Sequence, residues 1–188
     1  CHCGSEQKAQ LLLMGYGDMM TLQARLLGSV VDQVFQRTPC PTIVFRLSCP
    51  PAELTRVIVP LRNMRPYLHR QIQIAQKIAA AVEGSVTVLY ICAASTPDSA
   101  QQQYRQQLNQ SLDSNSHPSN SALPEVKINV VPHGDAAAVA LSTAKPTDLI
   151  VLHGRDCILT REFAMDNWGA TLLQAAPCSV ALFAESAI

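Results

Sequence analysis

The chain has 188 residues, of which 48% are hydrophobic and 15% charged, and its formal net charge at pH 7 is zero. This apolar content suffices for the core of one or two domains, whereas a balanced charge without a basic run gives no electrostatic basis for binding nucleic acid. No apolar stretch approaches the ~20 residues that cross a bilayer, so the sequence predicts no membrane span here.

The seven cysteines are scattered and odd in number. Cys92, Cys157 and Cys178 lie in or beside apolar segments, which is typical of reduced intracellular proteins in which cysteine acts as a small hydrophobic residue. The segment Cys1-His2-Cys3 has no second ligand pair at zinc spacing, so we predict no metal site.

Residues 1–47 predict a strand, a helix and a second strand. Gln10–Met14 is an apolar strand, Leu22–Gln36 carries an apolar face at helical spacing, and Thr42–Leu47 is rich in β-branched residues. Residues 48–54 contain the break Cys49-Pro50-Pro51 and are expected to form a linker.

Residues 55–188 alternate strands with helices. Most of the strands are continuously apolar, which is typical of a parallel sheet covered on both faces. We therefore predict an α/β domain with an open, parallel, five-stranded sheet and helices on both faces. Expected strands are Arg56–Leu61, Val86–Cys92, Lys127–Val131, Asp148–Leu152 and Ser179–Phe183; expected helices are Pro66–Glu83 (closed by Gly84), Thr96–Leu112, Ala136–Ala144 and Met165–Gln174.

The chain contains an internal repeat. Ala9–Phe45 aligns without a gap on Thr147–Phe183, so that each residue matches the one 138 positions later. Such self-similarity indicates repeated structural units. The second copy follows a full set of strands and helices, whereas the first does not. We therefore expect residues 1–47 to be the last third of one domain and 55–188 to be a complete domain, both from a longer parent.

The first copy carries three motifs: Leu12-Leu13-Met14-Gly15, then Leu27-Gly28-Ser29-Val30, then Thr38-Pro39-Cys40-Pro41. These motifs resemble the fourth strand, the phosphate loop (Gly-x2-Gly-x9-Gly-Ser/Thr) and the final strand of the universal stress protein family. The resemblance extends to the second copy through Asp148–Leu152 and Pro177-Cys178. It implies a Rossmann-like sheet and a nucleotide site that some members of the family use.

The second copy departs from the family's nucleotide site. His153, Asp156 and Asp166 stand at the three glycine positions, and Asn167 takes the Ser/Thr position. Arg62 stands where the family has an adenine-binding Asp. Two carboxylates would repel a triphosphate, so we expect this site to be degenerate. The first copy keeps its first and third glycines and its serine, but its adenine half is missing.

The carboxyl ends of the predicted strands bring together Arg62, His133, His153 and Arg155. Two interpretations remain open, an anion or nucleotide pocket gripped by arginine and a solvated rim of loop ends. Candidate ligands are ATP, AMP and cyclic di-AMP, with no cofactor certain. Nothing resembles a catalytic constellation, so we predict that the chain is not an enzyme. The candidate binding residues are Gly15, Gly28, Ser29, Arg62, Asn63, His153, Arg155 and Asn167.

The phrase Arg70–Gln76, together with Arg62-Asn63, is similar to the cytoplasmic C-terminal tails of bacterial cation/proton antiporters. This similarity implies a regulatory or sensory domain at the cytoplasmic side of an inner-membrane transporter, with the membrane domain as its partner. The resemblance also implies self-association, as a homodimer or as a pseudo-dimer of repeats paired through their final strands. The alternatives are a soluble universal stress protein that binds ATP or AMP, a cyclic dinucleotide receptor and a ligand-free interaction scaffold.

Overall fold

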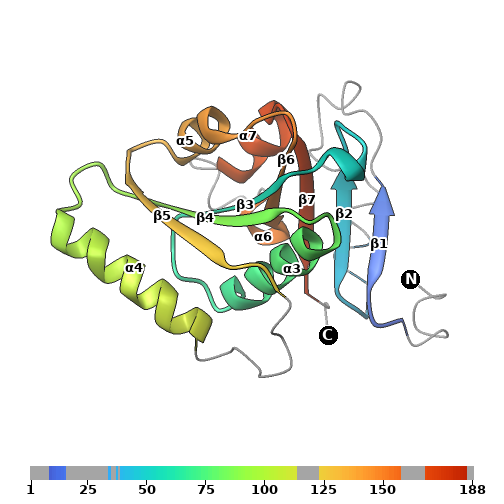
Figure 1. Ribbon diagram of the computed structural model, residues 1–188, viewed down its shortest axis with the longest axis horizontal. Helices are drawn as coiled ribbons and strands as arrows, with labels where there is room; N and C mark the ends of the chain where they lie inside the picture. The colour runs from blue at the N-terminus through green and yellow to red at the C-terminus, as the bar shows by residue number, and fades with distance from the viewer. Residues whose placement is uncertain are drawn as a thin grey trace.

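The computed structural model describes residues 9–15, 34, 37, 39–113, 123–157 and 168–185. Within them, one sheet carries helices on both faces (Figure 1). The strands are β1 (Leu12–Gly15), β2 (Thr42–Arg46), β3 (Arg56–Leu61), β4 (Ser85–Cys92), β5 (Val126–Pro132), β6 (Asp148–His153) and β7 (Ser179–Ala184). The helices are η2 (Pro51–Glu53, a 3-10 turn), α3 (Leu68–Ala81), α4 (Asp98–Asp113), α5 (Ala136–Thr143), α6 (Gly154–Cys157) and α7 (Trp168–Ala175).

The sheet has seven strands in the order β1-β2-β7-β6-β3-β4-β5. The predicted α/β class and the five parallel strands of residues 55–188 are confirmed, but the sheet does not end there. β2 pairs antiparallel with the outer edge of β7 and β1 pairs parallel with β2, so the first copy extends the same sheet. An uncovered β7 would leave a row of unpaired backbone groups, and β2 satisfies them.

The two copies of the repeat have the same strand register. In each, a residue lies opposite the one 30 positions later: Leu13 opposite Ile43 in β1 and β2, and Val151 opposite Ala181 in β6 and β7. The strand pair β1–β2 is therefore the structural equivalent of β6–β7. Of the helix predicted at Leu22–Gln36, the structure describes only residue 34.

The β2–β7 contact is symmetric between the copies. Val44 lies opposite Leu182, which is its own equivalent 138 residues later, and Ile43 lies opposite Phe183. The register therefore relates the two copies by a local two-fold axis perpendicular to the sheet. Because such an axis reverses strand direction, the carboxyl end of β1 lies at the edge of the sheet opposite to that of β6.

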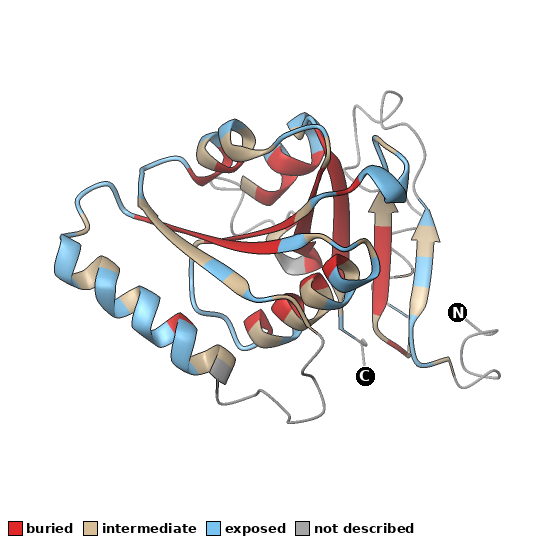
Figure 2. Ribbon diagram, in the orientation of Figure 1, coloured by how far each residue is buried: buried red, intermediate tan, exposed pale blue. Residues whose placement is uncertain are grey.

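Two apolar layers cover the sheet. One contains α3 and α4 over Val57 and Val59, and the other contains α5 and α7 over Ile58, because successive residues of a strand point to opposite faces. The central strands are buried along most of their length (Figure 2). None of the helices in the described part of the chain has the length and hydropathy that a bilayer span requires.

Helix α3 ends two residues before the predicted position. The left-handed residue after it is Glu83, with φ of 53°, and not Gly84. Gly84 N donates to Ala79 O at 2.8 Å, which closes a Schellman turn. Gly84 is needed for a different reason, since a Cβ there would lie 3.0 Å from Thr55 O.

An ion pair joins the two central strands at their amino ends. Arg56 Nε donates to Asp148 Oδ1 at 3.1 Å, and Arg56 Nη2 donates to Asp148 Oδ2 at 2.6 Å. The Asp148 side chain is 2% exposed. The same carboxylate also accepts a hydrogen bond from Lys145 N at 2.6 Å. Both of its oxygens are therefore hydrogen-bonded inside the fold.

We expect Arg56→Ala to lower the free energy of unfolding by about 3 kcal/mol, because it leaves a buried carboxylate without its counter-charge. Chemical denaturation measures the change. Arg105→Ala, an exposed arginine on α4, is the control and should change little. Equal effects of the two variants would contradict the structural importance of the pair.

Glu83→Gly should raise the free energy of unfolding by about 0.5 kcal/mol, because relief of left-handed strain exceeds the entropy that glycine loses on folding. Gly84→Ala, one residue later, should lower it, because its Cβ would press on the Thr55 carbonyl. Thermal unfolding of both variants distinguishes the two positions. A stabilising Gly84→Ala would show that the assignment of their roles is wrong.

Candidate functional site

The candidate site lies where the strand order reverses. β3 and β6 are neighbours, and from them the chain proceeds outward in opposite directions, to β4 and β5 on one side and to β7 on the other. Parallel sheets bind ligands beyond the carboxyl ends of such strands. Here these ends are Leu61 and His153, so the geometry identifies the place at which a ligand would sit.

Two stacked rings fill this place. Tyr67, just before α3, lies parallel to His153, the last residue of β6, with ring centroids 3.7 Å apart and an interplanar angle of 18°. His153 also makes a T-shaped contact with Phe183, with ring centroids 5.6 Å apart and an interplanar angle of 81°. Tyr67 and His153 are 8% and 3% exposed. The chain thus closes its own switch point with aromatic side chains.

Asp156, in the short helix α6, completes the closure. It accepts a hydrogen bond from the Tyr67 hydroxyl at 3.0 Å. Burial raises the pKa of the Asp156 carboxyl, while the Tyr67 hydrogen bond and the charge of Arg65 act in the opposite direction. Helix α7 approaches so closely that a Cβ on Gly169 would lie 2.3 Å from Asp156 O. A glycine at 169 therefore permits the packing that holds α6 in place.

The space that remains here is small. A cleft of about 240 Å³ is lined by Arg65, Tyr67, Asp156 and Glu185, and a cavity of about 20 Å³ lies beside Arg62. Sites for organic ligands usually enclose roughly 300–1,000 Å³. Both volumes around the described residues of the second copy therefore lie below the range that is usual for an organic ligand.

The structure brings together only some of the predicted site residues. Arg62 and Asn63 line the small cavity with Tyr67, and Tyr67 contacts His153. Arg155 lies in α6. His133 follows β5, two strands away from β3, so it does not join this cluster, in contrast to the expectation from topology.

The residues predicted in the first copy lie elsewhere. Gly15 ends β1, at the opposite edge of the sheet, and a Cβ there would meet none of the described atoms within 4 Å. Gly28, Ser29 and Asn167 lie outside the described residues. Any site in the first copy is therefore separate from the cluster around His153.

Tyr67 is the site residue that sequence reasoning missed. The sequence placed it within a helix that begins at Pro66, and helical periodicity gives no sign of a partner 86 residues away. The signal was its position, close behind the carboxyl end of a central strand. No group of three or more metal-ligating side chains occurs among the described residues, and Cys1-His2-Cys3 is not among them.

The fold is an α/β sheet whose switch point is occupied by the stacked rings of Tyr67 and His153. Comparisons confirm the resemblance: residues 5–46 match the universal stress protein family. The chain is also 30% identical over 152 residues to the Na(+)/H(+) antiporter NhaS5 of Synechocystis sp.. That match covers 80% of this chain and 21% of the antiporter, so the chain spans about a fifth of this relative's length.

Three solved structures share the fold at low sequence identity. A universal stress protein from Archaeoglobus fulgidus has a TM-score of 0.57 at 11% identity, covering 95% of this chain and 63% of its own. The cytoplasmic domain of a prokaryotic cation chloride cotransporter has a TM-score of 0.56 at 12% sequence identity, and the match covers 94% of this chain and 64% of that domain. A universal stress protein in complex with cAMP has a TM-score of 0.52 at 15% sequence identity, and the match covers 71% of this chain and 99% of that protein. At these identities the likeness establishes the fold alone.

Asp156→Asn should stabilise the fold at neutral pH and lose this advantage in acid. Because burial raises the folded-state pKa of Asp156, the stability linked to its protonated form is present at low pH and is lost as pH rises through that pKa. The neutral amide can still accept from Tyr67. Unfolding measured from pH 4 to pH 8 should show the gap between variant and wild type widening with pH. Glu125→Gln, at an exposed site, is the control, and a gap independent of pH would contradict the assignment.

Proposed function

We propose that this chain is a non-catalytic regulatory domain on the cytoplasmic side of a cation/proton antiporter. The observation that carries the proposal is the similarity to the Na(+)/H(+) antiporter over 80% of the chain, in a relative of which the chain spans only 21%. The membrane part of the same transporter would be its partner. The shared fold of a cotransporter's cytoplasmic domain is consistent with this role.

The closed switch point supports the non-catalytic part of the proposal. Tyr67, His153 and Asp156 contact one another where a substrate would lie. Catalysis requires groups that reach a reacting atom, and here they are engaged with each other. The domain would act instead by contacting two conformations of the transporter unequally, which shifts their populations.

We propose a division of the chain into a first-copy fragment (residues 1–47), a linker (48–54) and a complete domain (55–188). The β2–β7 pairing would make the two copies a pseudo-dimer within one polypeptide. This arrangement offers a rigid body through which the first copy, the second copy and the transporter influence one another.

Nucleotide sensing at the first copy is the second candidate function. Gly15 is retained, and a Cβ there would meet none of the described atoms within 4 Å, unlike its buried equivalent His153; a structural neighbour was solved in complex with cAMP. In that case ATP, AMP or cyclic di-AMP would bind at the edge of the sheet opposite to His153. The soluble stress-protein alternative receives less support, because the antiporter relative is much longer than this chain.

The decisive experiment is cation/proton exchange by the intact antiporter with and without the segment that corresponds to this chain, in everted membrane vesicles. We expect exchange to persist while its dependence on pH and cation concentration shifts, because a regulatory domain changes populations and not the transport pathway. Identical activation profiles would contradict the regulatory role. Arg105→Ala in the intact protein controls for nonspecific effects.

Thermal unfolding of the 188-residue chain with ATP, AMP or cyclic di-AMP, with and without Mg²⁺, tests the closed site. We expect no shift, whereas a ligand at 100 times its dissociation constant would add about 2.7 kcal/mol. A shift that persists in Tyr67→Ala would support binding at the first copy, whereas a shift that Tyr67→Ala abolishes would contradict closure. A shift abolished by Tyr67→Ala would place the ligand at the switch point of the second copy.

A further inference from the structure

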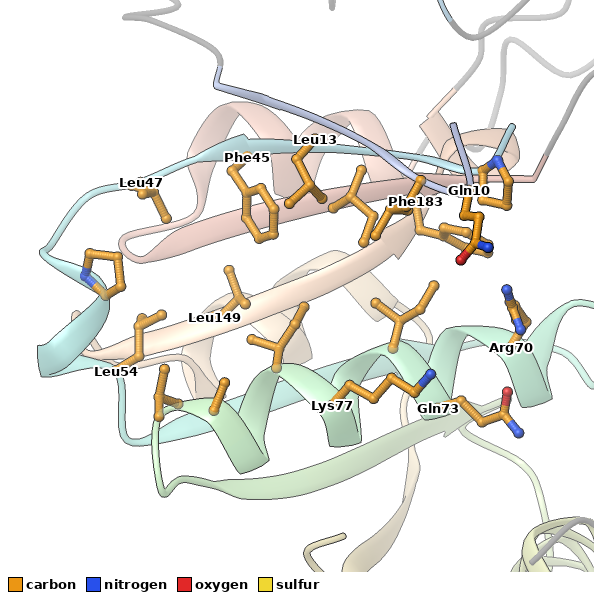
Figure 3. A pocket seen from close by; sticks show the side chains of 18 residues that line it. Gln10, Leu13, Phe45, Leu47, Leu54, Arg70, Gln73, Lys77, Leu149 and Phe183 are labelled. Carbon is orange, nitrogen blue, oxygen red and sulfur yellow. The ribbon is translucent and has the colours of Figure 1, made fainter. Parts of the chain in front are cut away.

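An apolar groove lies between the first-copy strands and α3. Its volume is about 630 Å³. Figure 3 shows Leu13, Phe45 and Phe183 on the sheet side, facing the α3 residues Gln73 and Lys77. No described carboxylate lines it, while Arg70 and Lys77 stand at its rim.

The groove holds most of the exposed large hydrophobic side chains of the described residues. Four large hydrophobic side chains are exposed among the described residues, and three of them line this groove: Leu11 at 46%, Leu13 at 60% and Leu47 at 47%. The fourth, Met64, lies outside it at 37%. Exposed apolar patches of this kind mark interaction surfaces.

The second copy shows what covers the equivalent face. The residues equivalent to Leu11 and Leu13 are Leu149 and Val151, and both are 0% exposed. They pack in one cluster with Ile72, Ala75 and Ala79 of α3. In addition, Gln71 Nε2 donates to Val151 O at 2.9 Å. In residues 55–188, this face of the sheet is therefore covered by helix α3.

In the described sheet, β1 has one neighbouring strand, whereas its equivalent β6 has two. β6 lies between β7 and β3, with Leu149 opposite Val57 and Ile150 opposite Ile58. β1 is the outermost strand of the described sheet and pairs with β2 alone. Leu12 N donates to Pro41 O at 2.9 Å, so by alternation the N–H groups of Leu11 and Leu13 point to the free edge.

We infer that the groove and the edge of β1 bind a strand–helix unit like β3–α3, supplied by the polypeptide that precedes Ala9 in the intact protein. The strand would pair parallel with β1 through the positions equivalent to Asp148–Ile150, which are Gln10–Leu12. The helix would lay an apolar stripe on Leu11 and Leu13. Its polar face would favour acidic residues near Arg70 and Lys77.

A second copy of this chain is a poorer occupant. Its own β3 is held between β6 and β4, and its α3 is already buried on its own sheet, so it has no such unit to offer. A covalently connected segment also binds at a high effective concentration. The inference rests on the repeat, on the groove and on the expectation that both copies come from a longer parent, and it does not depend on the proposed role in transport.

Hydrogen–deuterium exchange resolved to single amides tests the inference, comparing the 188-residue chain with the intact protein. We expect the Leu13 amide to exchange about 100-fold more slowly in the intact protein, because it becomes paired within the sheet. The Leu12 amide, bonded to Pro41 in both proteins, is the internal control. Fast exchange of Leu13 in both proteins would overturn the inference.

Matched variants make the test independent of the exchange measurement. Leu13→Glu should leave the melting temperature of the 188-residue chain nearly unchanged, since that side chain is exposed, and should lower that of the intact protein's domain by several degrees or more. Met64→Glu should have the same small effect in both. Equal effects of Leu13→Glu in both proteins would contradict the inference. So would a 188-residue chain that sediments as a dimer and dissociates with Leu13→Glu, which would make a second copy the occupant.

Discussion

The antiparallel contact between β2 and β7 is the constraint on which the arrangement of the whole chain depends. It is supported by side chains that cross the boundary: Arg46 Nη2 donates to Ala176 O and Cys178 O, each at 3.0 Å, and Ser48 N donates to Ser179 Oγ at 3.0 Å. Arg46 thereby satisfies carbonyls just beyond the end of α7, which have no further partner within the helix. The strand register of this contact is symmetric, whereas the side-chain hydrogen bonds across it are not. The two copies therefore share their backbone arrangement and differ in the side chains that support it.

This symmetry determines where a ligand could bind. A two-fold axis perpendicular to the sheet sends the carboxyl ends of β1 and β6 to opposite edges, so Gly15 and His153 cannot share a ligand. At one edge, Tyr67 stacks on His153 and donates a hydrogen bond to Asp156, so these side chains pack together beyond the carboxyl end of β6. At the other edge, no described atom lies within 4 Å of the position that a Cβ on Gly15 would take. The two copies have therefore diverged in their sites while their strand registers remained the same.

The repeat made much of the fold predictable. The offset of 138 residues predicted that β1–β2 copies β6–β7, and apolar runs located β3 and β7 to within a residue. The resemblance implied pairing through the final strands, either between two chains or between the two copies within one chain, and the sequence alone could not choose between them, because edge pairing depends on which surfaces meet. It also missed Tyr67, whose stacking on His153 is a tertiary contact. Gly84 does close helix α3, since its N–H donates to Ala79 O, but the close approach of Thr55 to Gly84 is a tertiary contact that helix patterns do not predict.

The divergence of the copies bears on how a signal could pass through the proposed regulatory domain. If the first copy is completed by a preceding strand–helix unit, any ligand held near Gly15 also orders β1, and β1 connects to the rest of the sheet only through β2. The register from β2 to β7 then carries a change at one edge to Phe183, which lies opposite Ile43 and touches the His153 ring. Paired strands and packed rings thus connect Gly15 to His153, and coupling between the two would require that both bias one two-state element.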